Sequence, residues 1–128
     1  MEISHKIYLV DDDAFFLQLL QMQLNDVVTN AEIKSFTSGE SLVEALNNEK
    51  PDLIVLDYFL DKENPYAMDG SQTLDKIKSI NAEQKVIMLS GQDNFKVVDH
   101  LFEQGVLDYV IKDEFAFNTL KEKIKKMI

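Results

Sequence analysis

The stretch Asp52-Leu53-Ile54-Val55-Leu56-Asp57 decides how the rest of the chain folds. Four consecutive apolar residues end in one carboxylate, and a polar loop follows them. A continuous apolar run of this length is typical of a strand buried on both faces of a parallel sheet. Such a strand delivers Asp57 to the carboxyl edge of the sheet, which is where ligands bind in open α/β proteins.

Three further apolar runs also end in charged or hydroxyl side chains. They are Ile7–Val10 before Asp11-Asp12-Asp13, Val86–Leu89 before Ser90, and Val106–Ile111 before Lys112. The carboxyl ends of parallel strands lie along one edge of a sheet. We therefore expect acids, one hydroxyl and one ammonium to face Asp57 in a single pocket.

Segments with helical periodicity separate these strands. Apolar residues recur at intervals of three and four, as in the expected buried stripe of Leu74, Ile77 and Ile80. Helices are expected after caps at Asp13, Thr37 and Asp69, after a cap in the polar loop 90–94, and over 117–127.

The order of strand and then helix repeats five times along the chain. Alternation of this kind predicts a parallel sheet with helices on both faces. Because crossover connections are right-handed, a doubly wound α/β sheet is the expected topology. Ala31–Phe36 alternates only weakly between apolar and polar residues, which predicts a half-exposed strand at the edge of that sheet.

The composition suits one small domain. The chain has 128 residues, 45% of them hydrophobic, and we expect residues 1–128 to share one core. Its 23 acids outnumber its 13 bases, and the net charge of −10 disfavours nucleic acid or an anionic membrane as a direct partner. The sequence has no cysteine, no signal-peptide pattern and no apolar run of membrane-spanning length, so we expect a cytoplasmic protein.

The residue types at the strand ends suggest phosphoryl transfer. Asp11, Asp12 and Asp57 would repel one another without a counter-charge. Carboxylate oxygens of this kind suit Mg²⁺. Lys112 and Ser90 would add an ammonium and a hydroxyl toward phosphoryl oxygens, while a carboxylate attacks phosphorus.

Each of these residues also has an ordinary structural explanation. Aspartate after a strand is common turn chemistry, and Asp13 is best explained as a helix cap. Taken singly, Ser90 is a loop hydroxyl, Lys112 a solvated charge and Tyr109 an edge-strand packing residue. Their occurrence together at four strand ends favours a functional site over four separate coincidences.

The same motifs resemble those of the receiver domain of two-component response regulators. Four stretches carry the resemblance: Leu9-Val10-Asp11-Asp12-Asp13, Leu53–Asp57, Ile87-Met88-Leu89-Ser90-Gly91 and Asp108–Lys112. The resemblance covers nearly the whole chain, from about Lys6 to Ile128. It implies a flavodoxin-like, five-stranded parallel sheet with strand order 2-1-3-4-5, which agrees with an edge position for the second strand.

The resemblance also implies an acceptor residue and a metal site. Asp57 resembles the aspartate that accepts a phosphoryl group. Asp11 and Asp12 resemble the acid pair that holds Mg²⁺, with Asp57 itself and the backbone carbonyl of Phe59 as further ligands.

A second set of residues resembles the parts of a receiver that respond to phosphorylation. Lys112 matches the lysine that pairs with the phosphoryl group. Ser90 matches the hydroxyl that moves toward it, and Tyr109 matches the aromatic ring that then turns inward. The helix after Ser90, the strand of Tyr109 and the last helix would present the changed surface.

The implied function is a phosphorylation-dependent switch in a phosphorelay, with no separate substrate to turn over. The implied donor is a histidine kinase or a histidine phosphotransfer protein. The implied recipient of the signal is an output domain or a target protein, and a phosphorylation-linked dimer is also compatible with the resemblance.

Three features depart from the usual receiver pattern. The Asp69-Gly70 pair follows Asp57 by 12 positions, which is several more than usual. Leu60 is followed by Asp61, where a proline is usual, and Lys112 is followed by Asp113, where many receivers have proline. The loop after Asp57 is therefore expected to have a shape of its own.

Three alternatives remain open from the sequence. One is a degenerate receiver that binds partners without being phosphorylated. Another is a phosphatase of the haloacid dehalogenase type, for which Asp11 and Asp13 form the required Asp-x-Asp but Asp57 has no role. The third is a flavin mononucleotide binder, whose phosphate the three acids of the first loop would repel.

Overall fold

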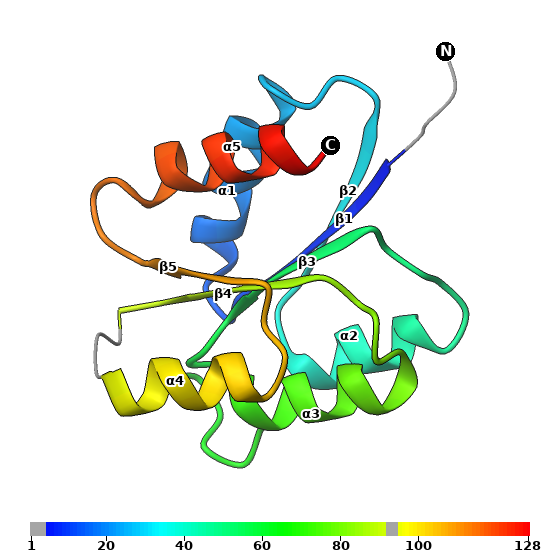
Figure 1. The fold of residues 1–128 in the computed structure, drawn as a ribbon, viewed down its shortest axis with the longest axis vertical. Helices are drawn as coiled ribbons and strands as arrows, with labels where there is room; N and C mark the ends of the chain where they lie inside the picture. The colour runs from blue at the N-terminus through cyan, green and yellow to red at the C-terminus, as the bar shows by residue number, and fades with distance from the viewer. Residues whose placement is uncertain (1–4, 92–94) are drawn as a thin grey trace.

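The computed structural model describes residues 5–91 and 95–128. Within these ranges, five strands alternate with five helices (Figure 1). The elements are β1 (His5–Val10), α1 (Ala14–Asn25), β2 (Ala31–Phe36), α2 (Gly39–Leu46), β3 (Leu53–Asp57), α3 (Gly70–Ile80), β4 (Val86–Ser90), α4 (Phe95–Glu103), β5 (Asp108–Ile111) and α5 (Ala116–Met127).

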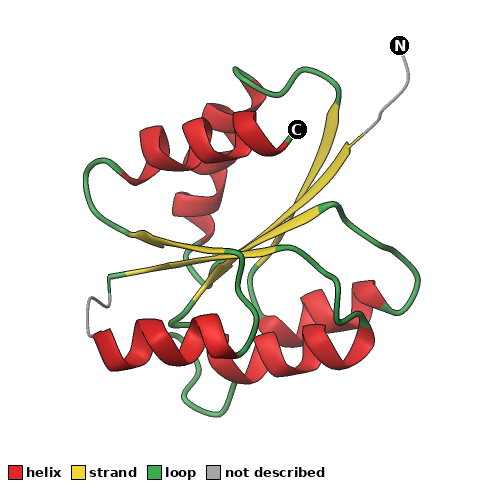
Figure 2. Cartoon of the chain, in the orientation of Figure 1, coloured by secondary structure: helices red, strands yellow, loops and turns green. Residues whose placement is uncertain are grey.

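The strands form one parallel sheet in the order β2-β1-β3-β4-β5. The expected doubly wound topology and the edge position of β2 are both confirmed. Helices α1 and α5 lie on one face of the sheet, and α2, α3 and α4 lie on the other (Figures 1 and 2). Because the strands are parallel, their carboxyl ends all lie at the same edge.

The two faces of the sheet carry separate hydrophobic clusters. Ile7 and Leu9 of β1 face α1 and α5, whereas Tyr8 and Val10 face the α2–α4 layer. Strand β3 alternates in the same way, and all five of its residues are buried. Coverage of both faces is why the central strands are continuous apolar runs in the sequence.

Two helix starts follow the expected chemistry. The Asp13 carboxylate accepts from the N–H groups of Phe15 and Phe16. The Asp69 carboxylate accepts from the Gln72 N–H, and the Gln72 side chain accepts in return from the Asp69 N–H, which completes a capping box.

Two details of the expected helices are wrong, and one lies outside the described residues. The cap of α2 is Ser38, not Thr37, because either of two adjacent hydroxyls can accept from a helix N–H and the chain enters one residue later. Ile80 is 44% exposed, because it is the last residue of α3 and no further helical turn covers its side chain. The cap expected in the loop before α4 falls at residues 92–94.

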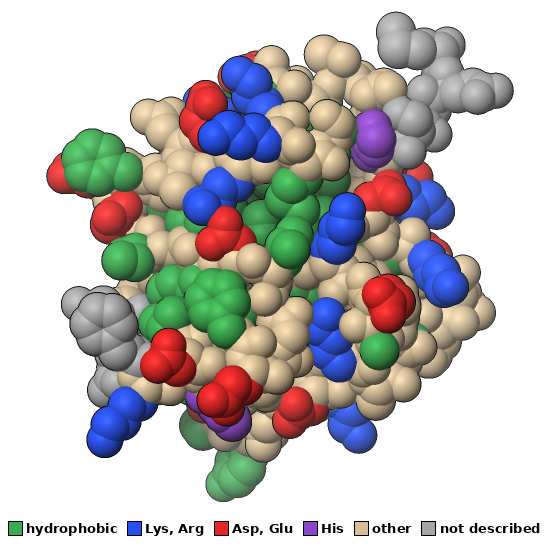
Figure 3. All heavy atoms as spheres, viewed as in Figure 1, with side chains coloured by type: hydrophobic (Ala, Val, Ile, Leu, Met, Phe, Trp, Pro, Cys, Tyr) green, Lys and Arg blue, Asp and Glu red, His purple; other side chains and the backbone are tan. Residues whose placement is uncertain are grey.

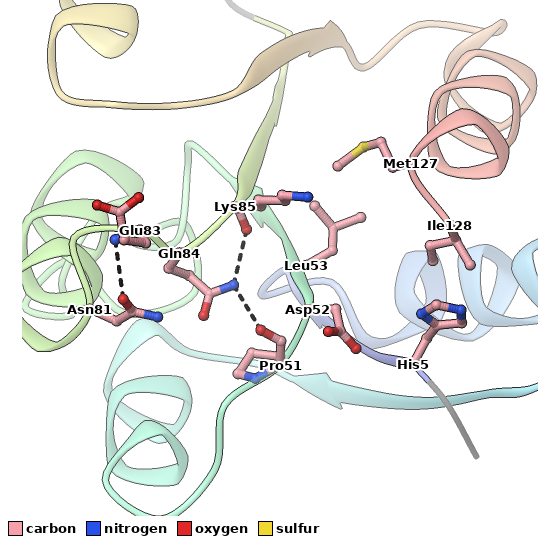
Figure 4. A pocket seen from close by; sticks show the side chains of 10 residues that line it. All are labelled: His5, Pro51, Asp52, Leu53, Asn81, Glu83, Gln84, Lys85, Met127 and Ile128. Atoms are coloured by element: carbon pink, nitrogen blue, oxygen red, sulfur yellow. Dashed lines mark hydrogen bonds between the residues drawn. The ribbon is translucent and has the colours of Figure 1, made fainter. Parts of the chain in front are cut away.

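The amino edge of the sheet carries a cavity of about 330 Å³ (Figure 4). Within it, the buried Gln84 side chain donates to the carbonyls of Pro51 (3.0 Å) and Lys85 (3.2 Å). These bonds tie the chain before β3 to the chain before β4, which is a structural task. The strand-end acids lie at the opposite edge, so this cavity is not the site that the sequence predicts.

Candidate functional site

The carboxyl edge of the sheet brings the expected strand-end residues together. Asp57 is the last residue of β3 and pairs in register with Leu89 of β4. Ser90 is the last residue of β4, and its carbonyl accepts from the N–H of Lys112 at 2.8 Å. The parallel register therefore places the ends of β1, β3, β4 and β5 at one level, as the sequence predicts.

Three carboxylates converge at this edge. One oxygen from each of Asp11, Asp12 and Asp57 lies within 4.8 Å of the others. Asp11 and Asp57 are each 1% exposed, and Asp12 is half-buried. The predicted proximity of the three acids is confirmed.

Asp57 differs from the other two acids in its hydrogen bonding. Among the described residues, neither of its two carboxylate oxygens accepts a hydrogen bond of ordinary geometry. Buried polar atoms are nearly always hydrogen-bonded, so a fully buried carboxylate without such donors is incomplete. A donor set of three clustered carboxylates with one of them unsatisfied fits a hard, oxygen-preferring cation.

Lys112 lies between two of the acids. Its ammonium donates to Asp11 Oδ2 at 2.6 Å and lies 3.7 Å from Asp57 Oδ2. It also sits 4.2 Å from the centre of the Phe16 ring, which stacks on Phe117 of α5. The charge of Lys112 is thus directed mainly at Asp11, a partner that sequence reasoning did not assign to it.

The electrostatics follow from burial and crowding. Burial, together with the charge of Asp11, raises the pKa of Asp57 to about 7, and the charges of Lys112 and Lys62 and the nearby N–H of Phe59 only partly oppose the rise. Burial also raises the pKa of Asp11, against the hydrogen bond from Lys112. For Lys112 itself, burial acts to lower the pKa, but the hydrogen bond to Asp11 and the charges of both acids outweigh it and raise the pKa.

The remaining predicted residues lie around this cluster of acids. Ser90 is fully buried at the end of β4. Tyr109 is half-buried in β5 and packs against the hydrophobic cluster on the α2–α4 side of the sheet. Phe59 is half-buried, with its ring edge-on to Tyr58 at a centroid distance of 4.9 Å. Their roles in phosphorylation stay predictions.

The loop 58–69 folds back over the site. The backbone N–H groups of Lys62 and Glu63 donate to Asp12 Oδ2 at 3.1 and 3.3 Å. Sequence reasoning noted the length of this loop but missed the contact. No residue type signals it, because every non-proline residue carries the N–H that makes the bond.

The family model for the response regulator receiver domain matches residues 7–125 of this chain. The chain therefore belongs to the receiver domain family of two-component response regulators. This is a family of regulatory domains in which signalling by phosphorylation is typical and Mg²⁺ binds at an acidic pocket.

Curated relatives are similar over most of the chain. The chemotaxis protein CheY of Bacillus subtilis is 27% identical over 98% of this chain and 99% of that protein. The sporulation initiation phosphotransferase F of the same organism is 25% identical, covering 98% of this chain and 95% of that protein. The chain spans only 49% of the alkaline phosphatase synthesis transcriptional regulatory protein PhoP of Bacillus subtilis, at 30% identity.

Solved structures agree on the fold. The receiver domain of NtrX from Brucella abortus is 27% identical and aligns with a TM-score of 0.76, covering 94% of this chain and 98% of that chain. A CheY-like receiver domain protein from Methanospirillum hungatei aligns with a TM-score of 0.77 at 22% identity, over 96% of this chain and 93% of that one. In the part of the chain that the structure describes, no helix is long and apolar enough to cross a membrane.

Proposed function

We propose that this chain is a phosphorylation-dependent switch that accepts one phosphoryl group on Asp57. The observation that carries the proposal is the state of that side chain. Asp57 is 1% exposed, without a well-formed hydrogen bond from the described residues, and lies beside two acids and one lysine. A structural aspartate would have its oxygens paired, whereas a nucleophile needs an uncommitted lone pair.

The carboxylates of Asp11, Asp12 and Asp57, with the carbonyl of Phe59, are the proposed holders of Mg²⁺. The donor set supports this assignment, because three clustered carboxylates with a single lysine leave an excess of negative charge. When bound, Mg²⁺ supplies positive charge that lessens the repulsion between Asp57 and an incoming phosphoryl group.

In the proposed step, a carboxylate oxygen of Asp57 forms an O–P bond while the N–P bond of a donor phosphohistidine breaks. The electron pair of the N–P bond goes to the imidazole nitrogen, which takes a proton from water. Lys112 lies 3.7 Å from Asp57 Oδ2, within reach of the phosphoryl oxygens that would replace that contact. Water later cleaves the acyl phosphate, which releases inorganic phosphate and regenerates the Asp57 carboxylate.

The proposed response runs through Ser90 and Tyr109 to the surface of α4, β5 and α5. The Ser90 hydroxyl would turn toward the phosphoryl group, and the Tyr109 ring would fill the space that it leaves. That surface carries exposed apolar side chains among charged ones over β5 and the adjoining helix ends (Figure 3): Phe102, Leu107, Ile111 and Phe115. Exposed apolar groups of this kind suit a protein partner.

The proposed partners follow from the family and the charge. The donor is a histidine kinase or a histidine phosphotransfer protein, and the recipient is an output domain, a target protein or a second copy of the chain. The net charge of −10 argues against direct binding of nucleic acid or an anionic membrane by this domain. The phosphatase alternative would need the Asp13 carboxylate, which instead caps α1.

The test is intact mass after incubation with Mg²⁺ and acetyl phosphate, beside an Asp57→Asn variant. The expected result is one phosphoryl adduct on the wild-type chain, absent from the variant and absent in EDTA. An adduct that persists in Asp57→Asn would move the acceptor elsewhere. An unmodified wild-type chain, tested with several donors, would favour a receiver that binds partners without phosphorylation.

A further inference from the structure

We propose that the loop 58–69 is a positioning element for Asp12, and that its backbone N–H groups set the affinity of the site for Mg²⁺. The inference rests on the proposed function, because it assumes that Asp12 is a ligand of that ion. It goes further by assigning a task to the segment in which this chain departs most from the usual receiver pattern.

The contact itself is specific. Two consecutive N–H groups, of Lys62 and Glu63, converge on the same oxygen, Oδ2 of Asp12. A carboxylate can accept several hydrogen bonds and still present its second oxygen to a cation. Paired N–H donors therefore orient the carboxylate without occupying both of its oxygens.

Asp12 is the acid that most needs such support. Asp11 is held by Lys112 at 2.6 Å and by the N–H of Asp13 at 2.9 Å. Asp57 is held by burial at the end of β3. Asp12 is half-buried on the rim of the site, and the loop N–H groups are the partners that fix its direction.

The loop is anchored so that these N–H groups stay in place. At its neck, the Gly70 N–H donates to the Tyr58 carbonyl at 2.7 Å. Leu60 is 2% exposed and packs in the hydrophobic cluster beneath α2 and α3. Near its far end, the Met68 N–H donates to Glu40 of α2 at 2.9 Å. Ends that meet and an apolar side chain that packs inward are features of a compact Ω-loop.

Hydrogen bonds to a ligating carboxylate are part of a metal site. Such partners orient the ligand, and losing them typically weakens metal affinity by about 10- to 100-fold. The Lys62 ammonium lies 5.8 Å from the centre of the Phe59 ring and acts on Asp57 through its charge, whereas the hydrogen bond to Asp12 comes from the Lys62 backbone N–H. We therefore expect the loop backbone to contribute to Mg²⁺ affinity independently of its side chains.

Proline substitution tests the N–H groups directly, because proline has none. Glu63→Pro removes one donor to Asp12, and Glu63→Gln is its matched control, since it changes the charge equally but keeps the N–H. Lys62→Pro and Lys62→Gln form a second pair for the other donor. The readout is the Mg²⁺ dissociation constant from isothermal titration calorimetry, with thermal unfolding in EDTA to show that each variant folds.

We expect each proline variant to bind Mg²⁺ about tenfold more weakly than its glutamine control. At saturating Mg²⁺ each should still form the Asp57 adduct with acetyl phosphate. Equal Mg²⁺ affinities within both folded pairs would overturn the inference and leave the proposed function intact. A wild-type chain that neither binds Mg²⁺ nor accepts a phosphoryl group would instead overturn the proposed function and, with it, this inference.

Discussion

Asp57→Asn is expected to stabilise the metal-free protein, although it removes the residue proposed to do the chemistry. Burial and the neighbouring Asp11 raise the pKa of Asp57 from 3.8 to about 7. At about 1.4 kcal/mol per pK unit, the ionised side chain destabilises the folded state by roughly 4 kcal/mol at alkaline pH. That pKa already includes the attraction to Lys112. Burying the asparagine amide has a cost of its own, so we expect a net gain of about 1 to 3 kcal/mol in the free energy of unfolding at alkaline pH.

The gain has a defined pH dependence. Between pH 3.8 and about 7, the folded chain holds a proton on Asp57 that the unfolded chain has released. The free energy of unfolding of the wild-type chain therefore falls through this interval as pH rises. Above the interval, the stabilisation that comes from holding this proton is fully lost. The asparagine amide of the variant does not titrate, so the difference between variant and wild type should be smallest at acidic pH and largest at alkaline pH.

The assay is urea unfolding in EDTA, followed by circular dichroism across this pH range. Asp26→Asn, an exposed aspartate at the end of α1, controls for loss of one negative charge and should change stability by less than about 0.5 kcal/mol. Added Mg²⁺ should shrink the gain, because it stabilises the wild-type chain selectively. A gain that is independent of pH, or a variant less stable than wild type at alkaline pH, would refute the electrostatic reasoning.

Three further substitutions test other contacts of the site. Lys112→Met leaves Asp11 buried without its counter-charge and should lower the free energy of unfolding, measured by urea titration, by roughly 3 kcal/mol at neutral pH. Its control is Lys123→Met, which breaks the more exposed ion pair with Asp108 and should lower the same free energy by less than about 1 kcal/mol. Phe16→Leu removes the ring beneath the Lys112 ammonium and should slow adduct formation a few-fold in a mass-spectrometric time course, with Phe16→Tyr close to wild type; equal rates for both would contradict a role for the ring. Gly70→Ala places a Cβ 2.5 Å from the Tyr58 Cα and should cost about 1 to 3 kcal/mol in thermal unfolding. Gly91→Ala, where the added Cβ meets nothing within 4 Å among the described residues, should be near neutral, and an equal loss at both glycines would contradict the packing argument.

The strands and the site's location were predictable because they depend on local patterns that the fold preserves. An apolar run such as Leu53–Leu56 has few stable places other than the centre of a parallel sheet, and the residue that ends it must then lie at the carboxyl edge. Caps were less certain, because Thr37 and Ser38 offer the same oxygen one residue apart. Only the entry direction of the chain, a tertiary property, selects between them.

The partners within the site were not predictable from residue types. Three carboxylates and one lysine can pair in several ways, and the sheet register and the Phe16 ring decide that Lys112 faces Asp11. The loop contact to Asp12 is made by backbone, which carries no signature in the sequence. Where the loop passes depends on its neck at Gly70 and its buried Leu60, which sequence alone does not relate to Asp12.

The pairing scheme explains why three similar carboxylates would have different tasks. Asp11 receives an ammonium, and Asp12 receives two backbone N–H groups, so their lone pairs are partly committed. Asp57, as deeply buried as Asp11, receives no hydrogen bond of ordinary geometry from the described residues. A lone pair that is not engaged in a hydrogen bond is the most available to form a bond to phosphorus. Burial without such donors also raises the pKa of Asp57, which disfavours its ionised form. The arrangement that leaves the lone pair available therefore needs additional positive charge, such as that of a bound cation, to keep the nucleophile ionised.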